Sequence, residues 1–257
     1  MDKQDKLEEL YKVRSKHSQY QTLASNFDAI FKERIKPSSY KYEEERLSFI
    51  EKNVDLNTVS KSIDIGGNTG YFSFEVLNRM RSGELDYYEG NFELCEFVRM
   101  AADVLEMNDR LHVHNEYYEF KDNNEKYDLG ILLNVVHHLG YDFGKSDFKM
   151  EEAKKMMLDS INFFSLNCKV LAFQIGFNWG GDVSKCLYKN GTKKEMIDWL
   201  KEGTKDYWDI VRIGVAETSE NGIRYNDLNE ANGGRRDELG EFLNRPLFIM
   251  KSKSFRD

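Results

Sequence analysis

The alternation of apolar and polar residues begins with two stretches of helical periodicity. Apolar side chains recur at helical spacing through residues 5–34 and again in the segment that contains Leu47 and Ile50. Pro37 interrupts the first stretch, and Ser39 is placed to cap the second helix. The pattern predicts N-terminal helices before the first strand, which either form a lid over a ligand edge or simply pack against the sheet.

From residue 62 onward, short apolar segments alternate with longer amphipathic ones. The fourth short segment, residues 127–133, is a nearly continuous apolar run of the kind that is buried on both faces of a sheet. Strands that alternate with helices predict a parallel sheet wound by right-handed crossovers. The predicted strands are 62–65, 85–89, 111–114, 127–133, 169–176, 208–215 and 247–250, and the predicted helices among them are 70–80, 92–107, 150–164 and 192–203.

The alternation stops before the last strand. Residues 217–243 are polar and contain no convincing apolar helix. Without a crossover helix, the last two strands can pair as an antiparallel, long-looped hairpin. We therefore predict an α/β fold with a seven-stranded, mostly parallel, doubly wound sheet, an antiparallel last strand and N-terminal helices. The predicted division is a helical cap or flank at residues 1–54 and one sheet domain at residues 55–257.

The composition narrows the class of protein. The 257-residue chain is 40% hydrophobic and 32% charged, which fits a soluble globular protein. No apolar run approaches the ~20 residues that span a bilayer, and the charged N-terminus lacks a signal core. Three widely spaced cysteines favour neither a disulfide framework nor a zinc cluster, so a reducing cytoplasm is the simplest location. The net charge of −8 argues against broad nucleic-acid binding but leaves room for a local basic patch.

The stretch 62–73 reads as a short buried strand, a tight glycine turn and the start of a helix. Gly66 and Gly67 can adopt backbone angles that are closed to other residues, and they leave room for a ligand against the main chain. Asn68 or Thr69 can cap the helix that follows. The free N–H groups at the start of that helix favour a polar or anionic ligand group.

Two acidic residues stand at the ends of the first two predicted strands. Asp64 lies just before the glycines, and Glu89 ends the second strand. A carboxylate at the tip of the second strand is well placed to accept two hydrogen bonds from a ribose diol. The combination predicts a nucleoside-binding edge; the alternative is an ordinary strand–turn–helix junction with incidental glycines.

The pattern Asp64-x-Gly66-x-Asn68-x-Gly70, followed by Glu89, resembles the nucleoside-binding pattern of class I S-adenosylmethionine-dependent methyltransferases. Asn68 stands where the family usually has a third glycine, although asparagine is common there. The dinucleotide pattern G-x-G-x-x-G is not met, because positions 68 and 71 are not glycine. The antiparallel end of the predicted sheet also resembles the methyltransferase sheet.

This resemblance covers roughly residues 55–251 and makes 55–257 an S-adenosylmethionine-binding domain, with S-adenosylhomocysteine as the product. In the family, an acid after the third strand often meets the adenine amino group. Glu116 matches that place, and it can equally be a solvated loop acid. The implied cofactor contacts are Asp64, Gly66, Gly67, Asn68, Gly70, Tyr71, Phe72, Glu89, Gly90, Asn91, Glu116 and Asn134.

The segment after the fourth strand, Asn134-Val135-Val136-His137-His138, matches the N-x-x-H-H form of several small-molecule methyltransferases. It does not match the Asn/Asp-Pro-Pro-aromatic signature of enzymes that methylate amines of bases or glutamine. A hydroxyl acceptor needs a base, and histidine titrates near neutrality. Because neighbours at a strand end face opposite ways, we expect one histidine to be the base and the other to pack, and we favour His138 as the base. Packing or capping by both histidines is the alternative.

Several residues on loops are candidates for binding the acceptor, although exposed Arg and Tyr side chains are often simply solvated. The arginines offer guanidinium forks that suit phosphate or carboxylate. The candidates are Asn178, Trp179, Arg235, Arg236, Tyr40 and Tyr42. No cysteine or further histidine stands at ligand spacing, so no metal site is predicted.

The resemblance implies O-methylation of a small polar molecule. A sugar or nucleotide-sugar hydroxyl, as in surface-polysaccharide pathways, is the first choice of acceptor, and the two arginines suit a phosphorylated one. Two alternatives stay open: methylation of RNA, including tRNA, through a local basic face, and a methyltransferase-like binding protein without catalysis. The sequence does not indicate an oligomeric state.

Overall fold

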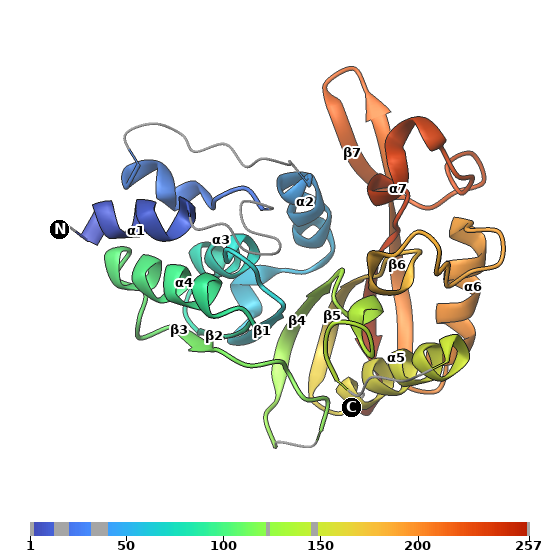
Figure 1. Cartoon of the computed structure of the whole chain (residues 1–257), viewed down its shortest axis with the longest axis horizontal. Helices are drawn as coiled ribbons and strands as arrows, with labels where there is room; N and C mark the ends of the chain where they lie inside the picture. Colours follow the sequence, from blue (N-terminus) through green and yellow to red (C-terminus); the bar gives the residue numbers. More distant parts are fainter. Residues whose placement is uncertain (1–2, 13–20, 32–40, 122–123, 145–148, 256–257) are drawn as a thin grey trace. The chain divides into compact units, whose positions relative to one another are not determined.

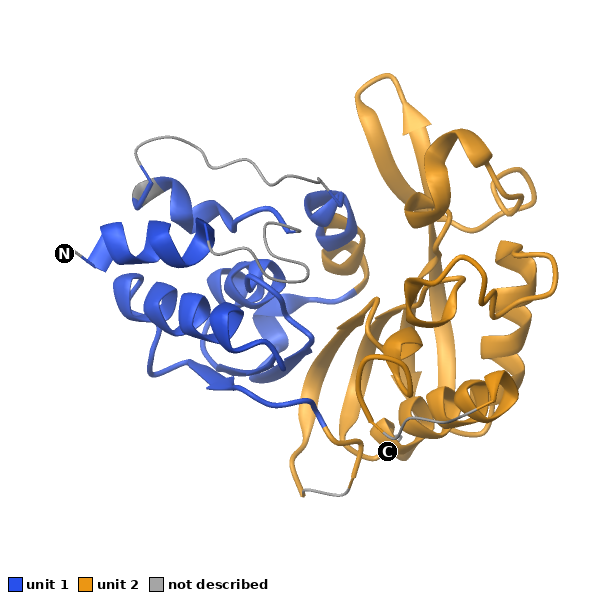
Figure 2. Cartoon of the chain, in the orientation of Figure 1, with its two compact units in different colours: residues 1–47, 54–118 blue, residues 48–53, 119–257 orange. Residues whose placement is uncertain are grey.

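The computed structural model describes residues 3–12, 21–31, 41–121, 124–144 and 149–255. They form an α/β fold with an eight-stranded mixed sheet (Figure 1). The chain divides into two compact units, one of residues 1–47 and 54–118 and the other of residues 48–53 and 119–257 (Figure 2). We call them unit 1 and unit 2.

Unit 1 contains the first three strands, which are parallel and lie in the order β3-β2-β1. The residues opposite one another include Asp64 and Tyr87, and Tyr87 and Val113. A helix follows each of the first two strands. The elements are β1 (Lys61–Ile65), α3 (Tyr71–Arg79), β2 (Glu84–Tyr88), α4 (Phe92–Val104) and β3 (Leu111–His114).

The N-terminal part of unit 1 packs on α3 and α4 through aromatic side chains. The ring of Tyr11, on α1 (Lys3–Lys12), lies 5.6 Å from that of Phe97 on α4. Phe27, in the short 3-10 helix Ser25–Ala29, stacks on Phe97 at 5.8 Å and meets the edge of Phe74 on α3 at 5.2 Å. Burial of these rings explains why the N-terminal apolar pattern is strong.

The predicted N-terminal helices are correct only in part. Residues 22–24 have no regular secondary structure, so the predicted helix over residues 5–34 is not continuous, and its described pieces are α1 and the short 3-10 helix. The second helix is α2 (Glu43–Asn53), whose residues 48–53 belong to unit 2. Pro37, Ser39 and Tyr40 lie outside the described residues.

Unit 2 contains five strands in the order β4-β5-β8-β6-β7. The pair β4–β5 is parallel, and the pairs β5–β8, β6–β8 and β6–β7 are antiparallel. The elements are β4 (Tyr127–Leu133), α5 (Met150–Phe164), β5 (Cys168–Gln174), α6 (Lys193–Thr204), β6 (Trp208–Ser219), β7 (Gly222–Asp227), α7 (Gly240–Leu243) and β8 (Leu247–Ser252).

The predicted antiparallel last strand is confirmed, because β8 runs antiparallel to both β5 and β6. The predicted number of seven strands is wrong: β7 is an eighth strand inside the polar stretch 217–243. Two residues, Glu220 and Asn221, join β6 to β7, and Gly222 has a φ of 103°. An Asn-Gly pair between strands is a hairpin signal, but β7 exposes most of its side chains and so lacks an apolar pattern.

The two compact units do not coincide with the predicted division after residue 54, because residues 1–47 lie with the first three strands in unit 1. That domain division stays a prediction. Within the described residues, no helix is both long enough and apolar enough to cross a membrane.

Candidate functional site

The turn after β1 has a left-handed backbone at three positions. The φ angles are 72° at Gly66, 53° at Asn68 and 79° at Gly70. Glycine adopts this conformation without strain, and asparagine is one of the few other residues that tolerate it. The Gly66 N–H donates to the carbonyl of Tyr88 at 2.8 Å, which ties the turn to the end of β2.

Tyr87 of β2 packs against this turn and stabilises it. A Cβ atom added at Gly67 would lie 2.4 Å from the Tyr87 ring, so no larger residue fits at position 67 without a shift. The Tyr87 hydroxyl donates to the carbonyl of Asn68, and the Asn68 side chain accepts the Thr69 N–H at 2.9 Å. Asn68 therefore stabilises the turn directly, in the place where a glycine is usual for the resembling family.

Asp64 is buried beneath the turn, with a relative exposure of 3%. Its carboxyl accepts a hydrogen bond from the Ser73 hydroxyl of α3 at 2.7 Å. Burial raises the pKa of Asp64 to about 7 and nearby Glu89 adds to the rise, while the bond from Ser73 lowers the pKa. Asp64 thus joins the end of β1 to the start of α3.

Glu89 lies one residue beyond β2 and is half-buried. One carboxylate oxygen accepts the Asn68 N–H at 3.2 Å, and the other accepts the Asn91 N–H at 2.9 Å. Burial raises the pKa of Glu89, and these backbone bonds lower it. Each oxygen of a carboxylate can accept two hydrogen bonds, so Glu89 keeps acceptor capacity for ligand hydroxyls.

The N-terminus of α3 is capped by a residue that no sequence motif indicated. The buried Gln21 uses its side-chain oxygen to accept the Tyr71 N–H at 3.3 Å and the Thr69 hydroxyl at 3.3 Å. Tyr71 and Phe72 are themselves buried, and the Arg46 guanidinium lies 5.0 Å from the Phe72 ring centre. Their side chains belong to the packing of unit 1.

The other predicted contacts of unit 1 lie around the ends of β2 and β3. Asn91 caps α4, since its side chain accepts the Leu94 N–H at 3.1 Å. A Cβ atom at Gly90 would lie 2.5 Å from the ring of Tyr117, an exposed tyrosine that the sequence analysis did not single out. Glu116 is exposed, two residues beyond β3.

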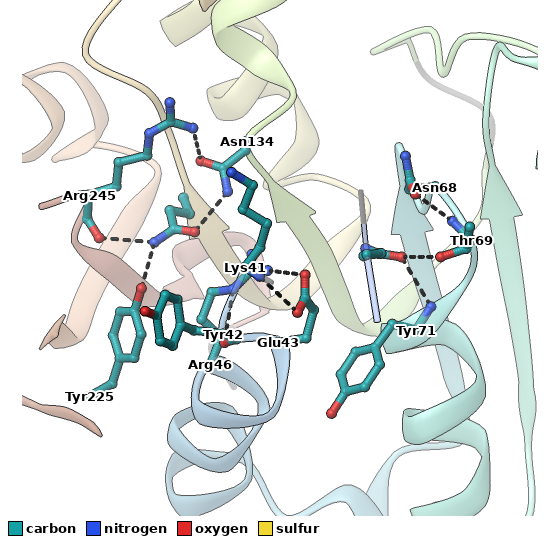
Figure 3. A network of polar contacts seen from close by, with 12 residues as sticks. Lys41, Tyr42, Glu43, Arg46, Asn68, Thr69, Tyr71, Asn134, Tyr225 and Arg245 are labelled. Atoms are coloured by element: carbon teal, nitrogen blue, oxygen red, sulfur yellow. Dashed lines mark hydrogen bonds and ion pairs between the residues drawn. The ribbon is translucent and has the colours of Figure 1, made fainter. Parts of the chain in front are cut away.

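In unit 2, Asn134 follows β4 and has a left-handed φ of 63°. Its N–H donates to the Gln174 carbonyl, and its side-chain Nδ2 donates to Gln174 Oε1, both at 2.8 Å. Its Oδ1 accepts from Arg245 Nη1, also at 2.8 Å (Figure 3). Three hydrogen bonds therefore fix the point at which the histidine segment leaves the sheet.

The two histidines have different surroundings. His137 is buried, and its Nδ1 accepts the Gly176 N–H at 3.3 Å. A Cβ atom at Gly176 would lie 2.8 Å from the His137 ring, so the strand end after β5 leaves room only for glycine. His137 therefore packs against the end of β5.

His138 is partly exposed, with 20% of its side-chain surface accessible. Its Nδ1 lies 2.5 Å from Oδ2 of Asp142, four residues later. A carboxylate at this nitrogen favours the tautomer with the proton on Nδ1, which leaves Nε2 as a proton acceptor. Gly181, in the loop after β5, has its Cβ position 3.9 Å from the His138 ring.

Trp179, a predicted acceptor contact, is buried with 7% exposure. Its indole N–H donates to the Leu139 carbonyl at 2.9 Å, which joins the loops after β4 and β5. Tyr141 meets it edge-on at 5.8 Å and is itself 42% exposed. Asn178 pairs with Cys186 in an isolated β-bridge.

The remaining acceptor candidates have partners within their own units. Arg235 bonds Asp237 at 2.7 Å and the Gly191 carbonyl at 2.8 Å. Arg236 lies 3.9 Å from Glu217. In unit 1, the carbonyl of Tyr42 accepts a bond from Arg46 at 3.4 Å (Figure 3). Within the described residues, no group of three or more His, Cys, Asp or Glu side chains is placed to hold a metal ion.

Comparison with known proteins identifies solved structures with a similar fold. No family model matches the sequence, and no curated protein matches it. Among solved structures, the StiE O-MT fragment 961–1257 aligns with a TM-score of 0.54 at 13% identity, over 83% of this chain and 75% of that one. The bifunctional kinase-methyltransferase WbdD aligns with a TM-score of 0.54 at 13% identity, over 95% of this chain and 46% of WbdD.

A third similar structure is the N-terminal domain of EvdMO1, determined in the presence of SAH and D-fucose. It aligns with a TM-score of 0.53 at 9% identity, over 98% of this chain and 97% of that domain. The chain has the fold of these methyltransferases. At such identities the likeness establishes the arrangement of strands and helices.

Proposed function

We propose that this chain is an S-adenosylmethionine-dependent methyltransferase that methylates a hydroxyl group of a small polar acceptor. The observation that carries the proposal is the 2.5 Å contact between His138 Nδ1 and Asp142, in the loop after β4. A histidine oriented by a carboxylate suits the deprotonation of a hydroxyl, whereas a neutral amine already presents a free lone pair. The fold shared with StiE O-MT and WbdD supports the same class of reaction.

The glycine turn of unit 1 fits the nucleoside part of the donor. The left-handed backbone at Gly66 and Gly70 forms the tight turn that leads from β1 into α3. Glu89 would accept the ribose hydroxyls with the lone pairs that its two backbone bonds leave. When bound, S-adenosylmethionine supplies the methyl group as part of a cationic sulfonium.

His138 has the role of general base in this proposal. Asp142 holds the proton on Nδ1, so that Nε2 takes the proton of the acceptor hydroxyl. As that proton leaves, the acceptor oxygen becomes a better nucleophile for an in-line displacement. The loop must hold this oxygen in position for the displacement to occur. The buried His137 keeps the loop in place through Gly176.

We propose a sugar or nucleotide-sugar hydroxyl as the acceptor. Support comes from EvdMO1, a neighbour in fold whose structure was determined with D-fucose present. A phosphate of such an acceptor would share Arg235 or Arg236 with their carboxylate partners Asp237 and Glu217. A cytoplasmic location is part of the proposal, and the three cysteines, all free thiols, fit a reducing compartment.

The test has two steps. Calorimetric titration with S-adenosylmethionine and S-adenosylhomocysteine should give saturable binding of both. Incubation of the protein and donor with a panel of sugars, sugar phosphates and nucleotide sugars should then give a product heavier by one methylene group.

Each alternative has its own result in this test. Binding of the donor with no transfer to any small molecule or RNA would indicate a binding protein. Transfer to RNA only would replace the small acceptor. Failure to bind either form of the donor would contradict the proposal as a whole.

A further inference from the structure

The histidine loop is held at its base by an ion pair near the C-terminal end of the chain. Arg245 and Glu241 form two bonds, Nε to Oε1 at 3.1 Å and Nη2 to Oε2 at 2.6 Å. The pair is partly buried, with 11% of the Arg245 side chain and 31% of the Glu241 side chain exposed. A two-pronged contact of this kind fixes the orientation of both side chains.

Each partner of this ion pair also contacts one of the two loops that follow β4 and β5. Arg245 Nη1 donates to Asn134 Oδ1 at 2.8 Å, at the start of the histidine segment. Glu241 Oε1 accepts the Phe177 N–H at 3.2 Å, at the start of the loop that carries Trp179. The ion pair therefore holds both loops at the points where they leave the sheet.

Gln174 completes the arrangement from the end of β5. It is fully buried, and its Nε2 donates to the Arg245 carbonyl at 2.9 Å and to the Tyr225 hydroxyl at 3.5 Å (Figure 3). Its Oε1 accepts from Asn134 at 2.8 Å. Asn134 thus has a donor and an acceptor partner for its side chain, which stabilise a left-handed backbone that otherwise costs energy.

We propose that Arg245 is a positioning residue for the proposed methyl transfer: together with Glu241 it holds Asn134 in its left-handed conformation and thereby sets the orientation of His138. Arg245 acts through Asn134 and has no role as a base or acid. The inference rests on the proposed function for its effect on catalysis, but its effect on the loop is independent of any activity.

Arg245→Lys is the sharpest variant, because lysine keeps the positive charge but has no planar fork with which to bond Glu241 and Asn134 together. Arg212→Lys is the matched control: Arg212 lies on β6 of the same unit, 3.9 Å from Asp227, and is 57% exposed. Hydrogen exchange reads the loop directly. In Arg245→Lys, the amides of Asn134, His138 and Phe177 should exchange at least about tenfold faster, while the exchange rates of the β4 amides stay unchanged. In the control variant, all these rates should match those of the wild type.

With an acceptor from the screen, Arg245→Lys should lower kcat by about tenfold to a hundredfold, because small displacements of a catalytic group are costly. A second test is a double-mutant cycle with Asn134→Gly, since glycine adopts a positive φ without a clamp. If Arg245 acts through Asn134, Arg245→Lys should have less than a third of its exchange effect at His138 in the Asn134→Gly background.

Unchanged exchange at Asn134 and His138 in Arg245→Lys would overturn the inference, and so would an undiminished effect in the Asn134→Gly background. If the exchange rates rise as expected but the wild-type protein methylates nothing, the proposed function fails while the positioning of the loop by Arg245 stands.

Discussion

The two units hold their loops by contacts of very different reach along the chain. In unit 1, the bonds of the Thr69 N–H to Asn68, of Ser73 to Asp64 and of the Asn68 N–H to Glu89 join residues that are 1, 9 and 21 positions apart. In unit 2, the bonds that fix the histidine loop join residues 39, 40 and 111 positions apart. Apart from the bonds of Gln21 to Thr69 and Tyr71, which span 48 and 50 positions, the glycine turn is held by local contacts, whereas the histidine loop depends on the completed sheet.

This difference assigns separate consequences to substitutions in the two units. In the proposed function, the turn of unit 1 binds the donor through its own backbone and Glu89, so changes there should alter affinity for the donor. A loop held from several strands orients a reactive side chain, so changes there should alter rate and stability. The predictions that follow test this separation.

The largest effect should come from His138→Ala. Removal of a general base lowers the rate of a proton-coupled step by about 10²–10⁴. We expect a single-turnover rate lower by that factor with the identified acceptor, and an unchanged affinity for S-adenosylhomocysteine. Asp142→Asn should also slow the transfer, because it removes the carboxylate that orients the imidazole.

His137→Ala provides the contrast within the same loop. His137 is buried and bonded to Gly176, so its loss should mainly lower the melting temperature, and it should lower the turnover of folded protein far less than His138→Ala does. If both variants keep near-normal rates and the wild-type dependence on pH, neither histidine is the base, and an amine acceptor becomes the better explanation.

The strands and the glycine turn of unit 1 follow from local pattern, because β-branched strands, glycines and acids at strand ends act within a few residues. The eighth strand, β7, does not, since its exposed side chains remove the apolar signal. The sequence favours His138 as the base, but the contact that packs His137 against Gly176, at the end of another strand, cannot be read from local pattern. One feature of the sequence does point to His138. Asp142 stands four residues after it, a spacing that brings two side chains together on one face of a helical turn.

Hydrogen bonds between polar side chains far apart in the sequence cannot be predicted from local pattern. Gln21 lies within the predicted helical stretch 5–34, Gln174 within a predicted strand, and Arg245 just before the last predicted strand. Their partners become apparent only when the sheet order brings the strand ends together. Conversely, the sequence indicates no partner for Arg235 or Arg236, but folding gives each of them a carboxylate partner.

Asp64→Asn tests the electrostatics beneath the donor turn. The pKa of Asp64 rises from 3.8 to about 7 on folding, so the folded state keeps the proton at pH values where the unfolded chain has lost it. The wild type therefore loses stability as the pH rises from about 4 to about 7, by as much as about 4 kcal/mol. Asparagine does not titrate, so the stability of the variant relative to the wild type should increase over this range. Parallel stability curves from urea unfolding between pH 4 and pH 8 would contradict the buried position of this carboxyl.

A smaller effect is expected from Gly176→Ala in unit 2. The added Cβ would lie 2.8 Å from the His137 ring, and overpacking of this kind costs about 1–3 kcal/mol. Thermal melts should give a lower melting temperature, by about 2–4 °C per kcal/mol for a chain of this size. Gly234→Ala is the control, because nothing lies within 4 Å of its Cβ position. Equal melting temperatures for the two variants would mean that His137 does not pack as described.

The most direct test of the separation between the units is a calorimetric titration of S-adenosylhomocysteine into Glu89→Ala and His138→Ala side by side. Loss of the Glu89 carboxylate would remove the two proposed bonds to the ribose, each worth about 1.5–3 kcal/mol before water replaces them. We predict a fall in affinity of at least tenfold for Glu89→Ala and wild-type affinity for His138→Ala, with both variants folded. Wild-type affinity in Glu89→Ala, or an equal loss in His138→Ala, would contradict the assignment of donor binding to the turn of unit 1.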